Sequence, residues 1–153
     1  MGPSLVDTDA HSDIHRSAHT EMQDGMGLLL ARIDNADDHT ALRLARALAD
    51  GWRLRVIAHA DAEEQDLFPV VLERFPAHRA TVAALLRDHQ LMRLLLDEAE
   101  REMDCEGRVT SSALGRFTAL LHLQRLHSIL EEQALLPKIP GVGQRTAGRG
   151  TGR

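Results

Sequence analysis

Residues 59–69 read His-Ala-Asp-Ala-Glu-Glu-Gln-Asp-Leu-Phe-Pro, and residues 127–137 read His-Ser-Ile-Leu-Glu-Glu-Gln-Ala-Leu-Leu-Pro. The two stretches share His, both Glu, Gln, Leu and Pro without a gap, at an offset of 127 − 59 = 68 residues. Residues four apart on a helix lie on one face, with Cβ atoms about 5–6 Å apart. His59 and Glu63 can therefore reach one site, and the second copy offers the same pair. The repeat predicts two helical hairpins, each contributing half of a shared site.

Apolar residues recur at helical spacing on both sides of this repeat, as Met22, Met26, Leu29 and Ile33 do. We expect Pro69 to kink or end the second helix, and residues 104–108 to form a loop. Four amphipathic helices with short connections predict an all-α, antiparallel up-down-up-down four-helix bundle. The expected helices run from about Asp7 to Asp34, from about His39 to Leu72, from about His78 to Met103, and from Thr110 or Ser111 to about Leu136.

The length of 153 residues fits one domain with a single core. We expect residues 7–140 to form the bundle. Residues 1–6 are expected to be a disordered N-terminus, and the Gly/Arg-rich residues 141–153 a disordered tail. Scarce aromatic residues and few β-branched residues agree with the helical prediction.

The net charge of −5 gives no general attraction to nucleic acid or to an anionic membrane, so neither is an expected partner. No apolar stretch approaches the roughly 20 residues that cross a bilayer, and the polar start of the chain does not resemble a secretion signal. The single cysteine, Cys105, cannot form an internal disulfide. We therefore expect a cytoplasmic protein.

Nine histidines are many for this length, and each half-site needs a further ligand from its partner helix. In the second hairpin the candidate is His89, the only histidine in the middle of its helix. Counting outward from the loops places His59 and Glu63 opposite about residue 12. The same count in the second hairpin places His127 and Glu131 opposite about residue 86, roughly three residues before His89. The same offset in the first hairpin selects His15 over His19, one turn further along.

Each half would thus supply two histidines and one glutamate. This combination, with positions left open, is the ligand set of non-haem Fe(II) sites that meet oxygen. Two such sets facing each other predict a dinuclear centre, in which bridging glutamates would hold the metals about 3.5–4 Å apart. The ligand types do not separate iron from zinc or manganese. The predicted metal ligands are His15, His59, Glu63, His89, His127 and Glu131.

The remaining acidic and histidine residues receive smaller roles or none. Glu64 and Glu132 lie about 100° further around their helices, where they would be solvated or would hydrogen-bond a ligand histidine. His122 is expected at the surface or in packing. No role is assigned to His11, His39 and His78, which lie near expected helix starts or loops.

One histidine on each odd helix and His-x-x-x-Glu on each even helix resembles the hemerythrin-like (HHE cation-binding) family, over roughly residues 13–140. The resemblance implies a four-helix bundle with a non-haem di-iron centre, and hence two iron ions as the cofactor. Oxygen-carrying hemerythrins have a second histidine where this chain has Arg93, and a longer spacing in the last motif. The chain is therefore more similar to the bacterial branch, and His19 is a candidate fifth imidazole.

The resemblance also implies a function. Family members bind dioxygen, react with nitric oxide or peroxide, sense iron or oxygen, or repair iron–sulfur clusters. We expect a sensor or redox-stress protein that binds or reacts with O2, NO or peroxide. The alternatives are a di-iron enzyme that draws on an external electron donor and, less favoured, a metal-free structural bundle.

Overall fold

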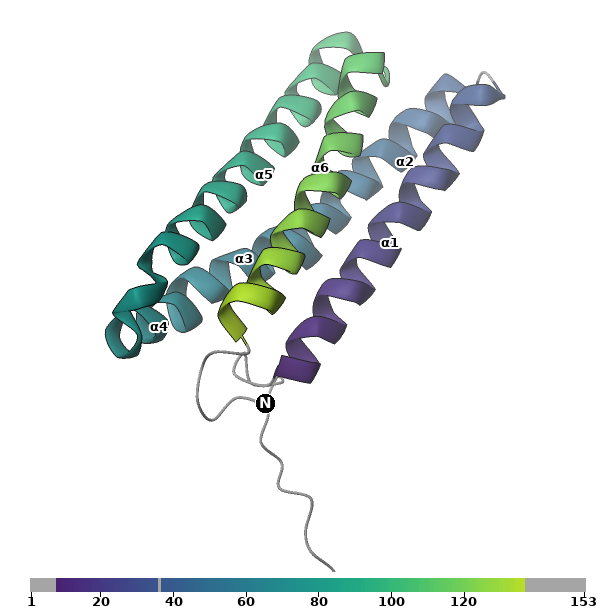
Figure 1. Ribbon diagram of the computed structural model, residues 1–153. Helices are drawn as coiled ribbons and strands as arrows, with labels where there is room; N and C mark the ends of the chain where they lie inside the picture. Colours follow the sequence, from purple (N-terminus) through teal and green to yellow (C-terminus); the bar gives the residue numbers. More distant parts are fainter. Residues whose placement is uncertain (1–7, 36, 137–153) are drawn as a thin grey trace, which may run out of the picture.

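The computed structural model describes residues 8–35 and 37–136, and its elements are all helical. Four helical rods lie side by side (Figure 1). The all-helical prediction is therefore confirmed for the described residues, whereas the alternation of helix direction stays a prediction. The first rod is α1 (Thr8–Asp34). The second rod is a run of five helical elements, α2 (Asp38–Gly51), η1 (Trp52–Ile57), α3 (Ala58–Ala62), η2 (Glu63–Leu67) and α4 (Phe68–Arg74). The short η3 (Pro76–His78) leads into the third rod, α5 (Arg79–Glu106), and the fourth rod is α6 (Ser111–Leu130) with η4 (Glu131–Leu135).

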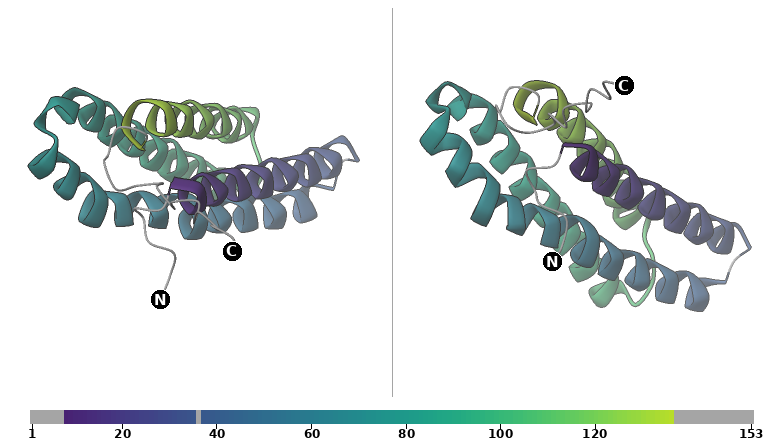
Figure 2. Two further views of the ribbon diagram at one scale, coloured as in Figure 1. Left: turned by 60° about the horizontal axis from the view of Figure 1, so that its bottom comes forward. Right: turned by 90° about the horizontal axis from the view of Figure 1, so that it is seen from below.

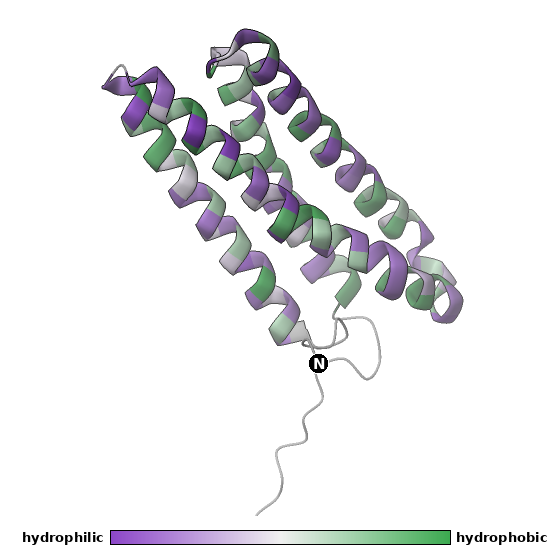
Figure 3. Ribbon diagram, turned by 180° about the vertical axis from the view of Figure 1, so that it is seen from behind, coloured by the Kyte–Doolittle hydropathy of each residue, from purple (hydrophilic) through white to green (hydrophobic). Residues whose placement is uncertain are grey.

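The helices form two pairs that pack against each other. α1 packs on α2 and α5 packs on α6, and further contacts join α1 to α6 and α2 to α5. Two other directions of view show the same neighbours (Figure 2). Apolar and polar residues are interspersed along the rods (Figure 3), and every rod contributes buried apolar residues to the core.

Local signals explain the helix ends. Thr110 caps α6 and Asp37 caps α2, each accepting a hydrogen bond from the backbone N–H three residues further on. Gly107 ends α5 in the left-handed region, at φ 64°, a conformation that glycine adopts without steric cost. The expected loop at residues 104–108 starts too early, because α5 continues to Glu106.

Of the two outcomes expected at Pro69, a kink or an end of the second helix, the end is wrong. The helical run continues to Arg74, with Pro69 in the first turn of α4, where a missing N–H is tolerated. The turn before it is a π-helix, in which Phe68 N–H donates to Glu63 O. The same type of turn starts at Glu131, at the equivalent place of the repeat. Isolated π turns within helices are frequent at functional sites.

A polar layer divides the buried core into two apolar clusters. The larger cluster contains Trp52 and Phe117, and the smaller contains Phe68 and Leu135. The second, third and fourth rods each pass from one cluster through the polar layer to the other. Buried polar groups are costly unless they are partnered, so this layer is the place to look for function. Its buried members are His11, His15, Glu63, Asp88, His89, Gln124, His127 and Glu131.

Within the described ranges, no helix combines the length and apolarity needed to cross a membrane. The expected cytoplasmic location stays a prediction. The expected disorder at residues 1–6 and 141–153 lies outside the described residues.

Candidate metal centre

The four rods each send ligand-type side chains into the polar layer. The six residues singled out from the sequence all lie there, and they are buried except His59, whose side chain is 13% exposed. A seventh, His11, joins them. α1 supplies His11 and His15, the second rod His59 and Glu63, α5 His89, and the fourth rod His127 and Glu131.

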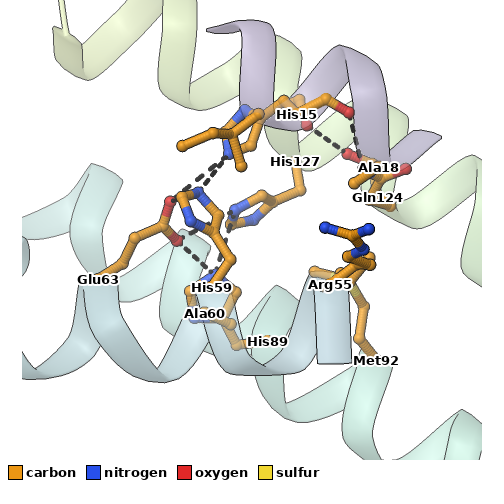
Figure 4. A pocket seen from close by; sticks show the side chains of 13 residues that line it. His15, Ala18, Arg55, His59, Ala60, Glu63, His89, Met92, Gln124 and His127 are labelled. Atoms are coloured by element: carbon orange, nitrogen blue, oxygen red, sulfur yellow. Dashed lines mark hydrogen bonds and ion pairs between the residues drawn. The ribbon is translucent and has the colours of Figure 1, made fainter. Parts of the chain in front are cut away.

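Glu63 stands between two sets of imidazoles (Figure 4). Its Oε1 lies 2.9 Å from His11 Nε2 and 2.8 Å from His59 Nε2. Its Oε2 lies 3.1 Å from His89 Nε2 and 3.9 Å from His127 Nε2. One carboxylate thus presents a separate oxygen to each set. We call the sets the first histidine group (His11, His15 and His59) and the second histidine group (His89 and His127).

Glu131 also faces both groups. Its Oε2 lies 3.2 Å from His11 Nε2 and 3.4 Å from His15 Nε2, on the side of the first group. The same oxygen lies 3.7 Å from His127 Nε2, in the second group. The two glutamates of the internal repeat therefore occupy the boundary between the two histidine groups.

The spacing of the imidazole nitrogens fits a cation in each group. His15 Nε2 and His59 Nε2 are 3.1 Å apart, and His89 Nε2 and His127 Nε2 are 3.2 Å apart. Two histidine nitrogens that each lie about 2.0–2.1 Å from one metal are separated by about 3.0–3.4 Å at angles of roughly 90–110°.

Several buried atoms in this layer lack a hydrogen bond. They include both oxygens of Glu63, both oxygens of Glu131 and both ring nitrogens of His11. Neighbouring imidazoles lie at ion-pair distance from these oxygens without the geometry of a hydrogen bond. An unsatisfied buried polar atom costs about 1–3 kcal/mol, and a cation among the lone pairs would remove that cost. Imidazole and carboxylate donors suit first-row transition ions, so the residues fit such a metal.

Without a metal, a proton on His11 balances the charge. Burial lowers the pKa of His11, but contact with the carboxylates of Glu131 and Glu63 outweighs it and raises the pKa to about 10. Burial raises the pKa of Glu63, and the surrounding histidines outweigh it and hold that pKa well below its usual range. Burial, together with the neighbouring His89, lowers the pKa of His127 to about 3. His11 is thus an imidazolium held between two carboxylates at neutral pH.

Carboxylates outside the cluster face the outward nitrogens of two imidazoles, with a hydrogen bond at His89 and without one at His15. His89 Nδ1 lies 2.8 Å from Glu64 Oε1, to which Arg93 Nη1 donates at 2.9 Å. Glu132, the repeat partner of Glu64, places Oε1 3.4 Å from His15 Nδ1. A carboxylate on the outer nitrogen fixes the ring and its tautomer, so that the inner nitrogen keeps its lone pair for a ligand.

The sequence reasoning missed His11 and gave His19 too much weight. His19 Nδ1 lies 2.8 Å from Gln124 Oε1, and among the described residues His19 is not part of a metal-ligating group. The fifth imidazole of the cluster comes from His11 instead. The signal was present in the sequence, because His11 lies four residues before His15 and therefore on the same helix face.

Comparison with known proteins identifies one family. The family model of the hemerythrin HHE cation-binding domain, which describes the sequences of its members, matches residues 9–139 of this chain. No curated protein and no solved structure matches the chain significantly.

Proposed function

Because the chain belongs to the hemerythrin HHE cation-binding domain family, we propose that its polar layer holds two non-haem iron ions and binds or reacts with O2, NO or peroxide. One ion would lie with the first histidine group and the other with the second. The position of Glu63, with one oxygen toward each group, is the observation that carries this proposal. The antiparallel up-down-up-down order of the helices, which their short connections favour, is part of the same proposal.

Iron is the proposed metal because two histidines and a carboxylate with open positions form the usual ligand set of non-haem iron sites that meet oxygen. When bound, iron supplies open coordination positions and accessible redox states. The chain's own part is to orient His89 through Glu64, and to limit water with the apolar clusters on either side.

The first function to test is a sensor or redox-stress role, in which ligand binding changes the state of the centre. The alternative is an enzyme, either a peroxidase or an NO-consuming protein supplied by an external electron donor, or an iron–sulfur cluster repair protein. Repeated consumption of NO or peroxide by the reduced protein, with a chemical donor present, would favour the enzyme. A single stoichiometric reaction would favour the sensor.

Elemental analysis combined with visible absorption in air tests the metal itself. We expect about two iron ions per chain and absorption bands from oxo-bridged ferric iron. Protein that remains metal-free after expression in iron-rich medium would support a structural bundle instead. Zinc bound in place of iron, after the same expression, would contradict the proposed redox function.

Metal affinity should rise with pH, because the proton on His11 must leave before that imidazole can bind a cation. With its pKa raised to about 10, His11 is protonated in the metal-free protein throughout the neutral range. The affinity of the first histidine group should therefore gain about tenfold per pH unit up to roughly pH 10. Titration calorimetry with Zn²⁺ in buffers of different ionisation enthalpy measures the protons released. The variant His11→Leu should release about one proton fewer than the unmodified protein, whereas an equal release from both would contradict this assignment.

Glu64→Ala should weaken metal binding by about 10–100-fold, the usual effect of losing an outer partner of a ligand histidine. The loss should be concentrated at the second histidine group, because Glu64 contacts His89. Chelator competition measures it. Glu132→Ala is the matched control, and its effect should be smaller because Glu132 lies 3.4 Å from its histidine rather than 2.8 Å. Equal losses of metal affinity in the two variants would contradict the prediction that the shorter contact of Glu64 matters more.

A further inference from the structure

A small cavity lies directly beside the histidine groups (Figure 4). Its volume of about 20 Å³ has room for about one water-sized molecule. Histidines of both groups line it, together with the apolar Met92 and the amide of Gln124. A diatomic or other very small ligand could therefore stand next to the candidate metal positions without any movement of the helices.

This cavity adjoins a groove on the outside of the bundle. The groove has a volume of about 630 Å³ and runs between α1 and the η1–α3 segment. The cavity and the groove share four lining residues, Ile14, Ala18, Arg55 and His59. His59 is also the most exposed of the candidate ligands, at 13% against 6% or less for the others. One route from solvent to the histidines therefore leads through this groove.

Arg55 is the only charged side chain of the described residues that lines both spaces. Its Nε lies 3.2 Å from Glu21 Oε2, at the outer side of the groove. The other acidic residue of the groove, Asp13, pairs with Arg16 at 2.9 Å. Figure 4 shows the Arg55 guanidinium across the cavity from Glu63. A ligand that moves inward thus passes the Asp13–Arg16 pair and then meets the guanidinium of Arg55, whose Nε faces Glu21.

We propose that Arg55 selects small monoanions, such as azide, for the centre, and that they arrive through the groove between α1 and η1. A guanidinium donates charge-assisted hydrogen bonds to an anion, and these are about twice as strong as neutral ones. Arg55 is thus a specificity-determining residue that favours small anions over neutral diatomic ligands. This proposal rests on the iron centre proposed above.

A second groove offers a competing route. It lies between α1 and α6, has a volume of about 500 Å³, and shares His15 and Ser128 with the cavity. Arg125 lines it, but does not line the cavity. Arg125→Gln is therefore the matched control for Arg55→Gln, because it makes the same change of charge on the other side of α1.

The test follows azide binding to the iron-loaded full-length protein by stopped-flow absorbance. In Arg55→Gln we expect azide affinity to fall by about 10–100-fold, mainly through slower association, while the association of neutral NO with the reduced protein stays within about twofold. Arg55→Lys should retain part of the azide affinity. Raising the salt from about 0.05 M to about 0.5 M should slow azide association in the unmodified protein and leave Arg55→Gln nearly unchanged. Unchanged azide binding in Arg55→Gln overturns the proposal, and so does a larger loss in Arg125→Gln.

Two further measurements separate the route and the residue from the metal. Ser17 is exposed and lines the groove between α1 and η1 but not the cavity. Ser17→Trp should therefore slow the association of both azide and NO. Unchanged association rates would show that the ligands enter by another route. In the zinc-loaded, diamagnetic protein, the Arg55 Nε–H resonance should shift when azide is added. If the Arg55 resonance shifts with azide but the protein from cells contains no iron, anion binding by Arg55 is supported and the proposed iron centre is rejected. If the protein binds iron but the Arg55 resonance does not shift, the iron centre is supported and the role of Arg55 is rejected.

Discussion

Glu63→Gln should remove both metal ions, with iron content falling from about two per chain to well below one. The substitution keeps the shape of the side chain but takes away its negative charge and replaces one oxygen by an NH2 group. Because each Glu63 oxygen faces a different histidine group, no orientation of the amide can offer an oxygen to both. Elemental analysis after expression in iron-rich medium measures the result.

Glu132→Gln is the control for that experiment, since Glu132 lies in the same repeat and contacts His15 from the outside. It should keep most of its iron. Circular dichroism should show that both variants remain helical, which excludes unfolding as the cause of metal loss. If Glu63→Gln retained both ions with an unchanged absorption spectrum, Glu63 would not be the shared ligand of the two groups.

His11→Leu should have the second-largest effect, with the first histidine group losing its ion and the second keeping it. Loss of an outer hydrogen-bond partner already costs about 10–100-fold in metal affinity, so loss of a direct ligand should cost more than about 100-fold. The second histidine group has no counterpart of His11. Leu85 precedes His89 by four residues, as His11 precedes His15, and Leu85 is fully buried in the smaller apolar cluster. His11→Leu therefore removes a ligand-type side chain from the first histidine group alone.

His19→Leu is the matched control, because His19 lies one turn along α1 and contacts Gln124 instead of the cluster. Chelator competition, followed by the iron content of each variant, distinguishes the two histidines. Equal iron content in His11→Leu and the unmodified protein would remove His11 from the site, and a loss confined to His19→Leu would return the fifth imidazole to His19.

The sequence was sufficient for the all-helical class and for most of the side chains that converge in the polar layer, because both depend on periodicity. The repeat of His59 and Glu63 at His127 and Glu131 puts each pair on one helix face, whatever the details of packing. The position of His89 follows from its isolation in the middle of a helix. These inferences need only the 3.6-residue period and the order of the helices.

His11 was missed because a count along a hairpin locates a level in the bundle but does not locate side chains. The count placed the first half-site opposite about residue 12, close to His11, and an offset borrowed from the second hairpin then moved the choice to His15. The two hairpins are not equivalent, since the first contributes two imidazoles from α1 where the second contributes one from α5. That asymmetry depends on which turn of α1 reaches Glu131, a contact between residues far apart in the chain.

The π turns and the outer contacts also lie beyond sequence reasoning. Pro69 marked a local irregularity, but the shift of the Phe68 N–H to Glu63 O depends on the packing that buries Glu63 and Leu67. The bond between Arg93 and Glu64 similarly depends on side-chain rotamers across two helices.

Anomalous diffraction at the iron absorption edge, from crystals of protein expressed in iron-rich medium, tests the central claim most directly. We expect two peaks within the polar layer, one beside the first histidine group and one beside the second, with Glu63 between them. A single peak, or peaks outside this layer, would contradict a dinuclear centre shared by the four rods.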